Sequence, residues 1–238
     1  MLTPKHYSKL VLNIPHSSTR FPLDAINEWN CSNLLTQSVN RWTDFYTDKL
    51  FSGNTPTPLP IESIIFPYSR FYCDAERLVN DPMEQVGQGI LYTKTDNGAQ
   101  RKLTDKTTKH GIMLYQRHHK IISDAIIKNA LIIDCHSFPA HISDYDICIG
   151  YNDDNTKPAL QTIEFMVYFF EKHHFSVGIN TPYSNSICAS SSASYSSVMI
   201  ELNKRIYMHE ESLEITDNFY SIQEMITELY YHLLGLNK

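Results

Sequence analysis

Three residues of this sequence have side chains and positions suited to hydrolytic chemistry: His16, His136 and Glu201. Each comes at the end of a short apolar run that is typical of a buried strand. In an open α/β sheet, ligands gather where the strands end. Imidazole nitrogen and carboxylate oxygen are the usual ligands of a catalytic zinc ion, which keeps one position for water. A single histidine at a strand end more often forms hydrogen bonds within a loop than binds a metal. The occurrence of His16, His136 and Glu201 at three strand ends therefore favours a metal site only slightly.

The third metal ligand should be a carboxylate, and Asp44 is the candidate that we select. The apolar spacing predicts a helix over 33–51, on which Asp44 and Asp48 would be four residues apart and share a face. One of them could bind the metal while the other orients a neighbouring side chain. Asp134 precedes His136 by two positions, so in an extended strand both side chains point to the same side. The predicted metal ligands are therefore His16, Asp44 and His136, with Asp48 and Asp134 as outer partners.

Two arginines, Arg70 and Arg77, follow a predicted strand. The planar guanidinium group matches a carboxylate with two hydrogen bonds, so these residues could bind a substrate carboxylate. They could equally form structural ion pairs with Asp74, Glu76 or Asp81. The sequence leaves the two readings equal.

Asn180 and Tyr183 bracket a rigid Thr181-Pro182 step after another predicted strand. Both polar side chains could line a substrate pocket. The same four residues could also be only a turn. We take Asn180 and Tyr183 as candidate substrate-binding residues.

Apolar runs of strand length alternate with longer stretches of helical periodicity. This alternation predicts one catalytic domain over 1–238, with a three-layer α/β/α fold around a mixed, mostly parallel sheet. The serine-rich stretch 190–197 is expected to be a mobile surface loop. The expected strands are 10–14, 61–66, 131–133, 146–149, 175–179 and 198–202, and the expected helices are 33–51, 109–130, 158–173 and 217–234.

Composition excludes several other classes of protein. The formal net charge is -6 and there is no basic stripe, which argues against a nucleic-acid partner. No stretch reaches the roughly 20 apolar residues that span a bilayer. The first ten residues lack the apolar core of a signal peptide. The five cysteines include no CxxC pair, which favours reduced thiols over disulfides or a thiolate zinc site. We expect a cytoplasmic protein without membrane contact; the sequence does not indicate its oligomeric state.

Six short segments of the sequence form an ordered set that spans most of the chain. They are PHSS at 15–18, TDFYTDKLF at 43–51, SRFYCDAERLVND at 69–81, DCHSFP at 134–139, NTPY at 180–183 and IELNKRIYMHE at 200–210. In this order they resemble the N-formylglutamate amidohydrolase family, and the stretch around ELNKRIYM is the most characteristic.

The resemblance implies a zinc-dependent amidohydrolase with a carboxypeptidase-like (phosphorylase/hydrolase-like) α/β fold. Its substrate would be a small N-acyl amino acid such as N-formylglutamate, and its cofactor one Zn²⁺ or another divalent ion. By position, His16 and His136 match the metal-binding histidines, and Glu201 matches the general base that activates a water molecule. Asp44 and Asp48 both match acidic positions, and Arg70 and Arg77 match positions of the family's basic segment.

The sequence departs from the family pattern near the expected substrate pocket. Residues 184–186 replace a frequent pair of glycines, Lys204 stands where an arginine is expected, and His209 stands at a usually acidic position. These changes leave open a related amidase that acts on peptides or cell-wall fragments, and a non-catalytic ligand-binding member. A hydrolase with Ser137 or Cys135 as nucleophile is a further alternative, although the sequence has no GxSxG elbow.

Overall fold

The computed structural model describes residues 2–53 and 59–236. Its internal contacts divide the chain into two compact units. The first, which we call the sheet unit, comprises Met1–Ile14, Tyr46–Ile64 and Ile122–Lys238, and the second, the loop-rich unit, comprises Pro15–Phe45 and Ile65–Ile121. The expectation of a single catalytic domain over 1–238 stays a prediction.

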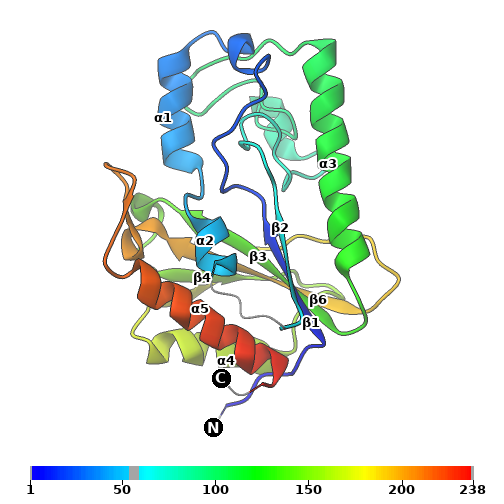
Figure 1. The fold of residues 1–238 in the computed structure, drawn as a ribbon, viewed down its shortest axis with the longest axis vertical. Coiled ribbons are helices and arrows are strands. Elements are labelled where there is room, and N and C mark those ends of the chain that lie inside the picture. Colours follow the sequence, from blue (N-terminus) through cyan, green and yellow to red (C-terminus); the bar gives the residue numbers. More distant parts are fainter. Residues whose placement is uncertain (1, 54–58, 237–238) are drawn as a thin grey trace. The chain divides into compact units, whose positions relative to one another are not determined.

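The sheet unit contains a six-stranded mixed sheet in the order β2-β1-β3-β6-β4-β5 (Figure 1). The strands β1, β3 and β6 run parallel to one another, β4 is antiparallel to β6, and β5 is parallel to β4. The bounds are β1 Lys9–Ile14, β2 Ile61–Ile65, β3 Ala130–Phe138, β4 Ile147–Gly150, β5 Val177–Ile179 and β6 Tyr195–Asn203.

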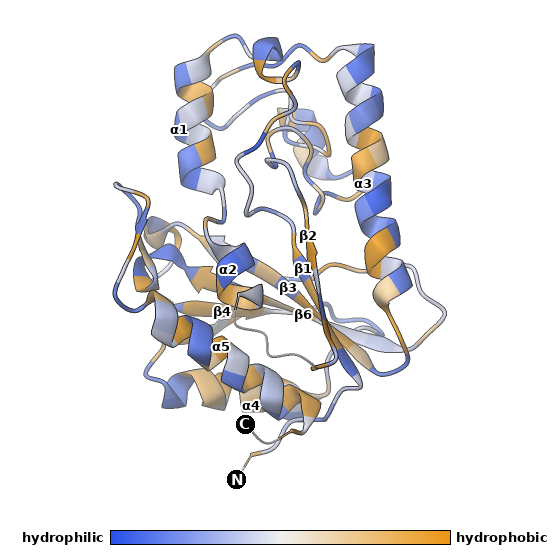
Figure 2. Ribbon diagram, viewed as in Figure 1, coloured by the Kyte–Doolittle hydropathy of each residue, from blue (hydrophilic) through white to orange (hydrophobic). Residues whose placement is uncertain are grey.

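The central strands are buried on both faces. All nine residues of β3 are buried, and in β6 only Tyr195 is partly exposed. Strands that are covered on both sides consist of nearly continuous apolar residues, and the strands at the centre of the sheet are accordingly largely hydrophobic (Figure 2). Polar side chains within β3 and β6 therefore need partners inside the protein.

Helices cover this sheet. The helices α2 (Thr47–Ser52) and α5 (Phe219–Leu234) pack against β1, and α4 (Leu160–Lys172) packs against β4 and β5. Another layer contains the last turn of α3 (Asp105–Ala125), where Ile122 packs with Val11 and Ile132. The predicted fold class, a mostly parallel mixed sheet flanked by helices, is confirmed. Among the described residues, no helix combines the length and the hydropathy needed to cross a membrane.

The loop-rich unit has few regular elements. It contains α1 (Ser32–Trp42), α3 as far as Ile121, and two 3₁₀ turns at Ile26–Glu28 and Pro82–Val86. Aromatic side chains make much of its core, which includes Trp29, Phe71 and Tyr92. Arg101 is buried there, pairs with Glu28 (Nε to Oε2, 2.9 Å) and donates to the carbonyl of Tyr72 at 2.9 Å.

The predicted helix 33–51 is wrong as a single element. It ends at Trp42 and resumes at Thr47, with Tyr46 in the left-handed region at φ 67°. The backbone N–H of Asp44 donates to the carbonyl of His16 (3.0 Å) and not to a preceding turn of helix. Asp44 and Asp48 consequently do not lie on one helix, and the expectation that they share a helix face is also wrong.

Other predicted boundaries change as well, including those of the helix expected over 109–130, which spans Asp105–Ala125. The third strand is longer than expected, so that Asp134 and His136 lie within β3 and not after it. The serine-rich stretch is not a loop throughout, because β6 begins at Tyr195 and buries Ser196 and Ser197. The structure adds a short hairpin of β7 (Met208–His209) and β8 (Glu214–Ile215), which was not predicted.

Truncation of Ile132 tests the buried sheet. Ile132→Ala should lower the free energy of unfolding by about 2–5 kcal/mol, because it removes apolar contacts and leaves a cavity. Ile127→Ala is the matched control, since Ile127 is 46% exposed, and it should cost less than about 0.5 kcal/mol. Urea unfolding of both variants provides the measurement. Equal costs would contradict the described burial of β3.

Candidate active site

In the sheet unit, His136, Glu201 and Cys148 form a row across three adjacent strands. His136 of β3 is the register partner of Glu201 of β6, and Glu201 in turn is the partner of Cys148 of β4. Side chains of register partners project to the same face of a sheet. The row is buried, and it brings two of the three residues singled out by the sequence next to each other.

Asp134 fixes the orientation of His136. The Nε2 atom of His136 lies 3.2 Å from Oδ1 of Asp134, two residues earlier on the same face of β3. Burial works against ionisation of Asp134, but His136 and the hydrogen bonds from Asn13 and Ile187 hold its pKa below the usual range. An ionised carboxylate can only accept hydrogen bonds, so Nε2 carries the proton.

His16 has the same arrangement in the loop-rich unit. Its Nε2 lies 2.8 Å from Oδ1 of the fully buried Asp74, and its Nδ1 lies 3.7 Å from Oδ2 of Asp44. Burial opposes ionisation of Asp74, yet His16 and Arg70 hold its pKa well below the usual range. Asp74 was predicted only as an ion-pair partner for the arginines. Its contact with a histidine 58 positions earlier has no signal in the local sequence.

Arg70 and Arg77 both contact Asp74. The distances to Oδ2 of Asp74 are 3.0 Å from Nη2 of Arg70 and 3.5 Å from Nε of Arg77. Burial works against the charge of Arg70, but Tyr92 and Asp74 raise its pKa above the usual value. The structural ion pairs that the sequence allowed are therefore present. Binding of a substrate by either arginine stays a prediction.

The other two candidate substrate-binding residues follow β5. Asn180 adopts φ 51° and accepts a hydrogen bond from the backbone N–H of Tyr151 (2.9 Å). The ring of Tyr183 meets Phe138 edge to face, with 6.2 Å between centroids, and its carbonyl accepts from the thiol of Cys148 at 3.2 Å. Tyr183 therefore lies beside the row that contains Glu201.

Neither alternative nucleophile is placed to use His136 as a base. Cys135 and Ser137 are adjacent to His136 in β3, and successive side chains of a strand point to opposite faces. The thiol of Cys135 donates to the carbonyl of Ile133 at 3.2 Å. Cys148 does lie on the same face as His136, but burial raises its pKa to about 11, with a further rise from Glu201, so it is a neutral thiol at pH 7. This geometry disfavours a cysteine or serine hydrolase.

The residues present suit a divalent metal ion. In both His16 and His136, Nε2 faces a buried carboxylate. A metal-binding histidine usually hydrogen-bonds to a carboxylate in this way through the ring nitrogen that does not bind the metal. His16, Asp44 and His136 are all buried, and nitrogen and carboxylate donors suit zinc. The chemistry of the donors thus fits the predicted cofactor.

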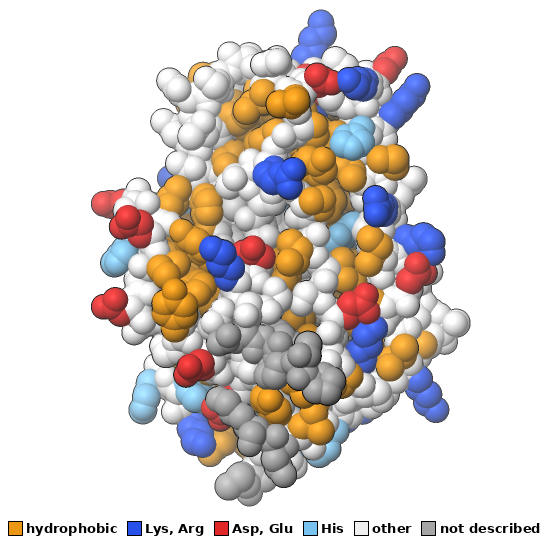
Figure 3. Space-filling model, viewed as in Figure 1, with side chains coloured by type: hydrophobic (Ala, Val, Ile, Leu, Met, Phe, Trp, Pro, Cys, Tyr) orange, Lys and Arg blue, Asp and Glu red, His pale blue; other side chains and the backbone are white. Residues whose placement is uncertain are grey.

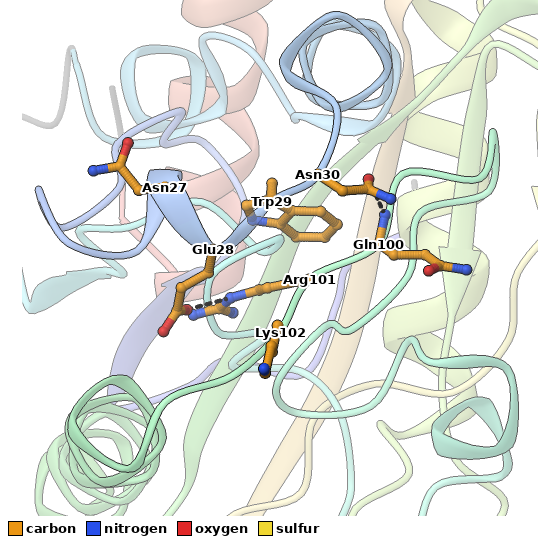
Figure 4. Close-up of a pocket in the computed structure, with 7 residues that line it drawn as sticks. All are labelled: Asn27, Glu28, Trp29, Asn30, Gln100, Arg101 and Lys102. Carbon is orange, nitrogen blue, oxygen red and sulfur yellow. Dashed lines mark hydrogen bonds and ion pairs between the residues drawn. The ribbon is translucent and has the colours of Figure 1, made fainter.

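A hollow of about 360 Å³ in the loop-rich unit contains none of these residues (Figure 4). Within it, Glu28 pairs with Arg101 and the backbone N–H of Gln100 donates to Asn30, as the dashed lines show. It is lined by Asn27, Glu28, Trp29, Asn30, Gln100, Arg101 and Lys102. We assign no role in the reaction to this hollow.

The family model for N-formylglutamate amidohydrolase matches residues 8–208. The chain belongs to the N-formylglutamate amidohydrolase family. This confirms the resemblance read from the six segments, and it assigns the chain to a family of amidohydrolase enzymes. Such enzymes take small-molecule substrates. The face in Figure 3 shows acidic and basic side chains interspersed.

A solved structure gives the same fold. The crystal structure of N-formylglutamate amidohydrolase from Ralstonia eutropha JMP134 matches with a TM-score of 0.79 and 19% sequence identity. The match covers 98% of this chain and 96% of that chain. No curated protein matches this sequence.

Replacement of Asp74 tests the network around it. In metal-free protein, Asp74→Asn should lower the free energy of unfolding by about 3–5 kcal/mol near pH 7, because it leaves Arg70 and Arg77 without their buried counter-charge. The pKa of Asp74 is lower in the folded chain than its value of about 3.9 in the unfolded chain. The contribution of Asp74 to the free energy of unfolding is therefore fully present at a pH above that unfolded pKa. The contribution is lost as the pH falls through the folded-state pKa.

Urea unfolding of wild type and variant over a range of acidic to neutral pH measures this difference. Asp153→Asn, at a highly exposed surface pair, is the control and should leave the unfolding free energy nearly unchanged. A wild-type advantage that is absent at neutral pH, or that persists undiminished in strong acid, would contradict the assignment.

Proposed function

We propose that this protein is a metal-dependent amidohydrolase that cleaves the amide bond of N-formylglutamate or a close N-acyl amino acid. The observation that carries the proposal is the family match over residues 8–208, which includes every candidate site residue. The products from N-formylglutamate would be formate and glutamate.

The proposed metal ligands are His16, Asp44 and His136, and the proposed ion is Zn²⁺. The contact between Nδ1 of His16 and the carboxylate of Asp44 supports Asp44 over Asp48 as the acidic ligand. Asp48 keeps only an outer role, since the helix expected to align it with Asp44 is interrupted. A bound zinc ion would lower the pKa of a water molecule and polarise the amide carbonyl.

Glu201 is the proposed general base. Glu201 in β6 is the register partner of His136 in β3. This places the side chain of Glu201 on the strand adjacent to a proposed metal ligand, which supports the role. Glu201 takes one proton from the attacking water as the oxygen bonds to the formyl carbon. The same carboxyl group then gives that proton to the nitrogen as the C–N bond breaks. No covalent link between the chain and the substrate is needed.

Arg70 and Arg77 are the proposed partners of the substrate's carboxylates, with Asn180 and Tyr183 at the pocket wall. N-formylglutamate carries two carboxylates, and a guanidinium group can bind each through a pair of hydrogen bonds. Asp74 would hold both arginines in place while leaving other N–H groups of their guanidinium ions for the substrate. Asp134 and Asp74 orient the two histidines.

The general-base role is tested by Glu201→Gln. The variant should fold, keep its metal and lose about 10²–10⁴-fold in kcat, because the amide cannot take up the proton. Release of glutamate from N-formylglutamate measures kcat, and metal analysis measures the bound ion. Glu214→Gln, at an exposed glutamate of β8, is the control and should match wild type. Wild-type turnover by Glu201→Gln would remove this assignment.

Metal dependence is tested by chelation. Dialysis against a chelator should abolish turnover, and added Zn²⁺ should restore it with about one ion per chain. His16→Ala and His136→Ala should each bind the ion much more weakly, since each removes one of the three proposed ligands. Full activity in metal-free protein would contradict the proposal.

A panel of N-acyl amino acids and N-acyl peptides in the same assay identifies the substrate, and turnover of peptides alone would favour the related amidase.

A further inference from the structure

One face of helix α3 contacts the segment 73–77, which belongs to no helix or strand. Gly111, Tyr115 and His119 are spaced four residues apart on this helix, so they form a stripe about 12 Å long. Each of the three meets a different residue of the segment. The contacts are the thiol of Cys73 with the carbonyl of Gly111 (3.3 Å), the hydroxyl of Tyr115 with the carbonyl of Arg77 (2.8 Å), and Nε2 of His119 with the carbonyl of Ala75 (2.9 Å).

The contact of Tyr115 holds the main chain of Arg77. At the other end of that side chain, Nε is buried and lies 3.5 Å from Oδ2 of Asp74, and Nη2 donates to the hydroxyl of Tyr92 at 3.4 Å. An arginine side chain has several rotatable bonds and loses much rotamer freedom when it is ordered. Its guanidinium group therefore stays in one place most readily when both ends are held. Tyr115 provides the anchor at the backbone end.

Packing alone does not require the hydroxyl of Tyr115. The side chain is only half-buried, so water could satisfy the hydroxyl and a phenylalanine could fill the same space. The ring of Tyr115 also packs on that of His119, with 4.3 Å between centroids. This contact restricts the rotamer of Tyr115 and directs its hydroxyl from a regular helix to an irregular segment.

We propose that Tyr115 is a positioning residue that fixes the guanidinium group of Arg77 through the main chain of that residue. If Arg77 binds a substrate carboxylate, Tyr115 sets how well it does so without touching the substrate. This consequence for the substrate rests on the function proposed above, whereas the placement of Arg77 does not. A tyrosine that only joins the segment to α3 would affect stability alone.

The first test is the kinetics of Tyr115→Phe in protein that carries its metal. The variant should raise KM for N-formylglutamate about 3–10-fold, the effect of one lost hydrogen bond, and keep kcat within about twofold of wild type. The double variant Tyr115→Phe/Arg77→Ala shows whether the effect passes through Arg77. It should have the same KM as Arg77→Ala, because residues that act as a unit are not additive.

Tyr72→Phe is the matched control. Tyr72 belongs to the same loop-rich unit, and its hydroxyl also joins this part of the chain to α3 through the carbonyl of Thr107 (3.2 Å) and Nδ1 of His110 (2.7 Å). The control removes the same atom as Tyr115→Phe but leaves the main chain of Arg77 bound. It should lower the melting temperature at least as much as Tyr115→Phe and leave KM unchanged.

The second test observes Arg77 without substrate. The Nε–H group of a buried arginine exchanges slowly with water and gives its own signal in ¹⁵N NMR. The signal of Arg77 is assigned by its loss in Arg77→Ala. In Tyr115→Phe we expect its exchange to be about tenfold faster than in wild type, because the side chain is held at one end only. In Tyr72→Phe the exchange should match wild type.

The outcomes separate this inference from the proposed function. If Tyr115→Phe speeds the exchange at Arg77 but Arg77→Ala leaves KM unchanged, the substrate role of Arg77 is wrong and the role of Tyr115 stands. If Arg77→Ala raises KM while Tyr115→Phe changes neither KM nor the exchange, the role of Tyr115 is wrong. Two further results would overturn it: equal effects of Tyr72→Phe on the exchange, or an effect of Tyr115→Phe on KM that persists without Arg77.

Discussion

The parallel pairing of β3 with β1 on one side and β6 on the other determines which polar side chains can meet. A one-residue shift in either pairing would turn one set of side chains to the opposite face. In the observed register, Asn13 lies opposite Asp134, and His136 lies opposite Glu201. The hydrogen bond from Asn13, the orientation of His136 and the position of Glu201 all follow from this register. Because β3 is buried on both faces, a shifted register would separate the buried polar side chains of Asp134 and His136 from these partners.

The buried carboxylates of the two units, Asp74 and Asp134, are stabilised by different kinds of group. Each contains a carboxylate that is fully buried beside a histidine, and a buried charge without compensation is strongly destabilising. Asp74 is balanced by the cations Arg70 and Arg77. Asp134 is instead held by two neutral donors, the amide of Asn13 and the backbone of Ile187. The carboxylate of Asp134 also faces the imidazole of His136, which helps to hold the pKa of this carboxyl below its usual range.

Local periodicity was enough to predict most of the fold. The apolar runs identify the six strands of the sheet, although β3 extends five residues beyond its predicted end, and alternation of strands with helices identifies the fold class. The two-residue spacing of Asp134 and His136 predicts their contact, because the side-chain period of a strand is two. The serine residues 196 and 197 were missed as strand residues because a polar side chain in a buried strand breaks the apolar pattern.

Other features depend on partners that are distant in the sequence. Helical spacing continues through residues 43–46, and the helix stops there because Asp44 bonds to the carbonyl of His16. The contact of His16 with Asp74 likewise joins segments that no local pattern relates. Asn13 could have been noticed as a polar residue in an apolar strand, but its meaning appears only with its register partner. Roles of individual site residues, including Glu201 as base, remain predictions, because family membership and fold do not test them.

The alternation of side chains in β3 also bears on the type of reaction. Residues 134, 136 and 138 face one side of the strand, while Cys135 and Ser137 face the other. The row that holds Glu201 and His136 thus contains a carboxylate, an imidazole and the neutral thiol of Cys148, but no activated nucleophile. A carboxylate can move protons to and from a water molecule without forming a bond to the substrate. The alternation of side chains in β3 therefore favours attack by water over attack by the chain itself.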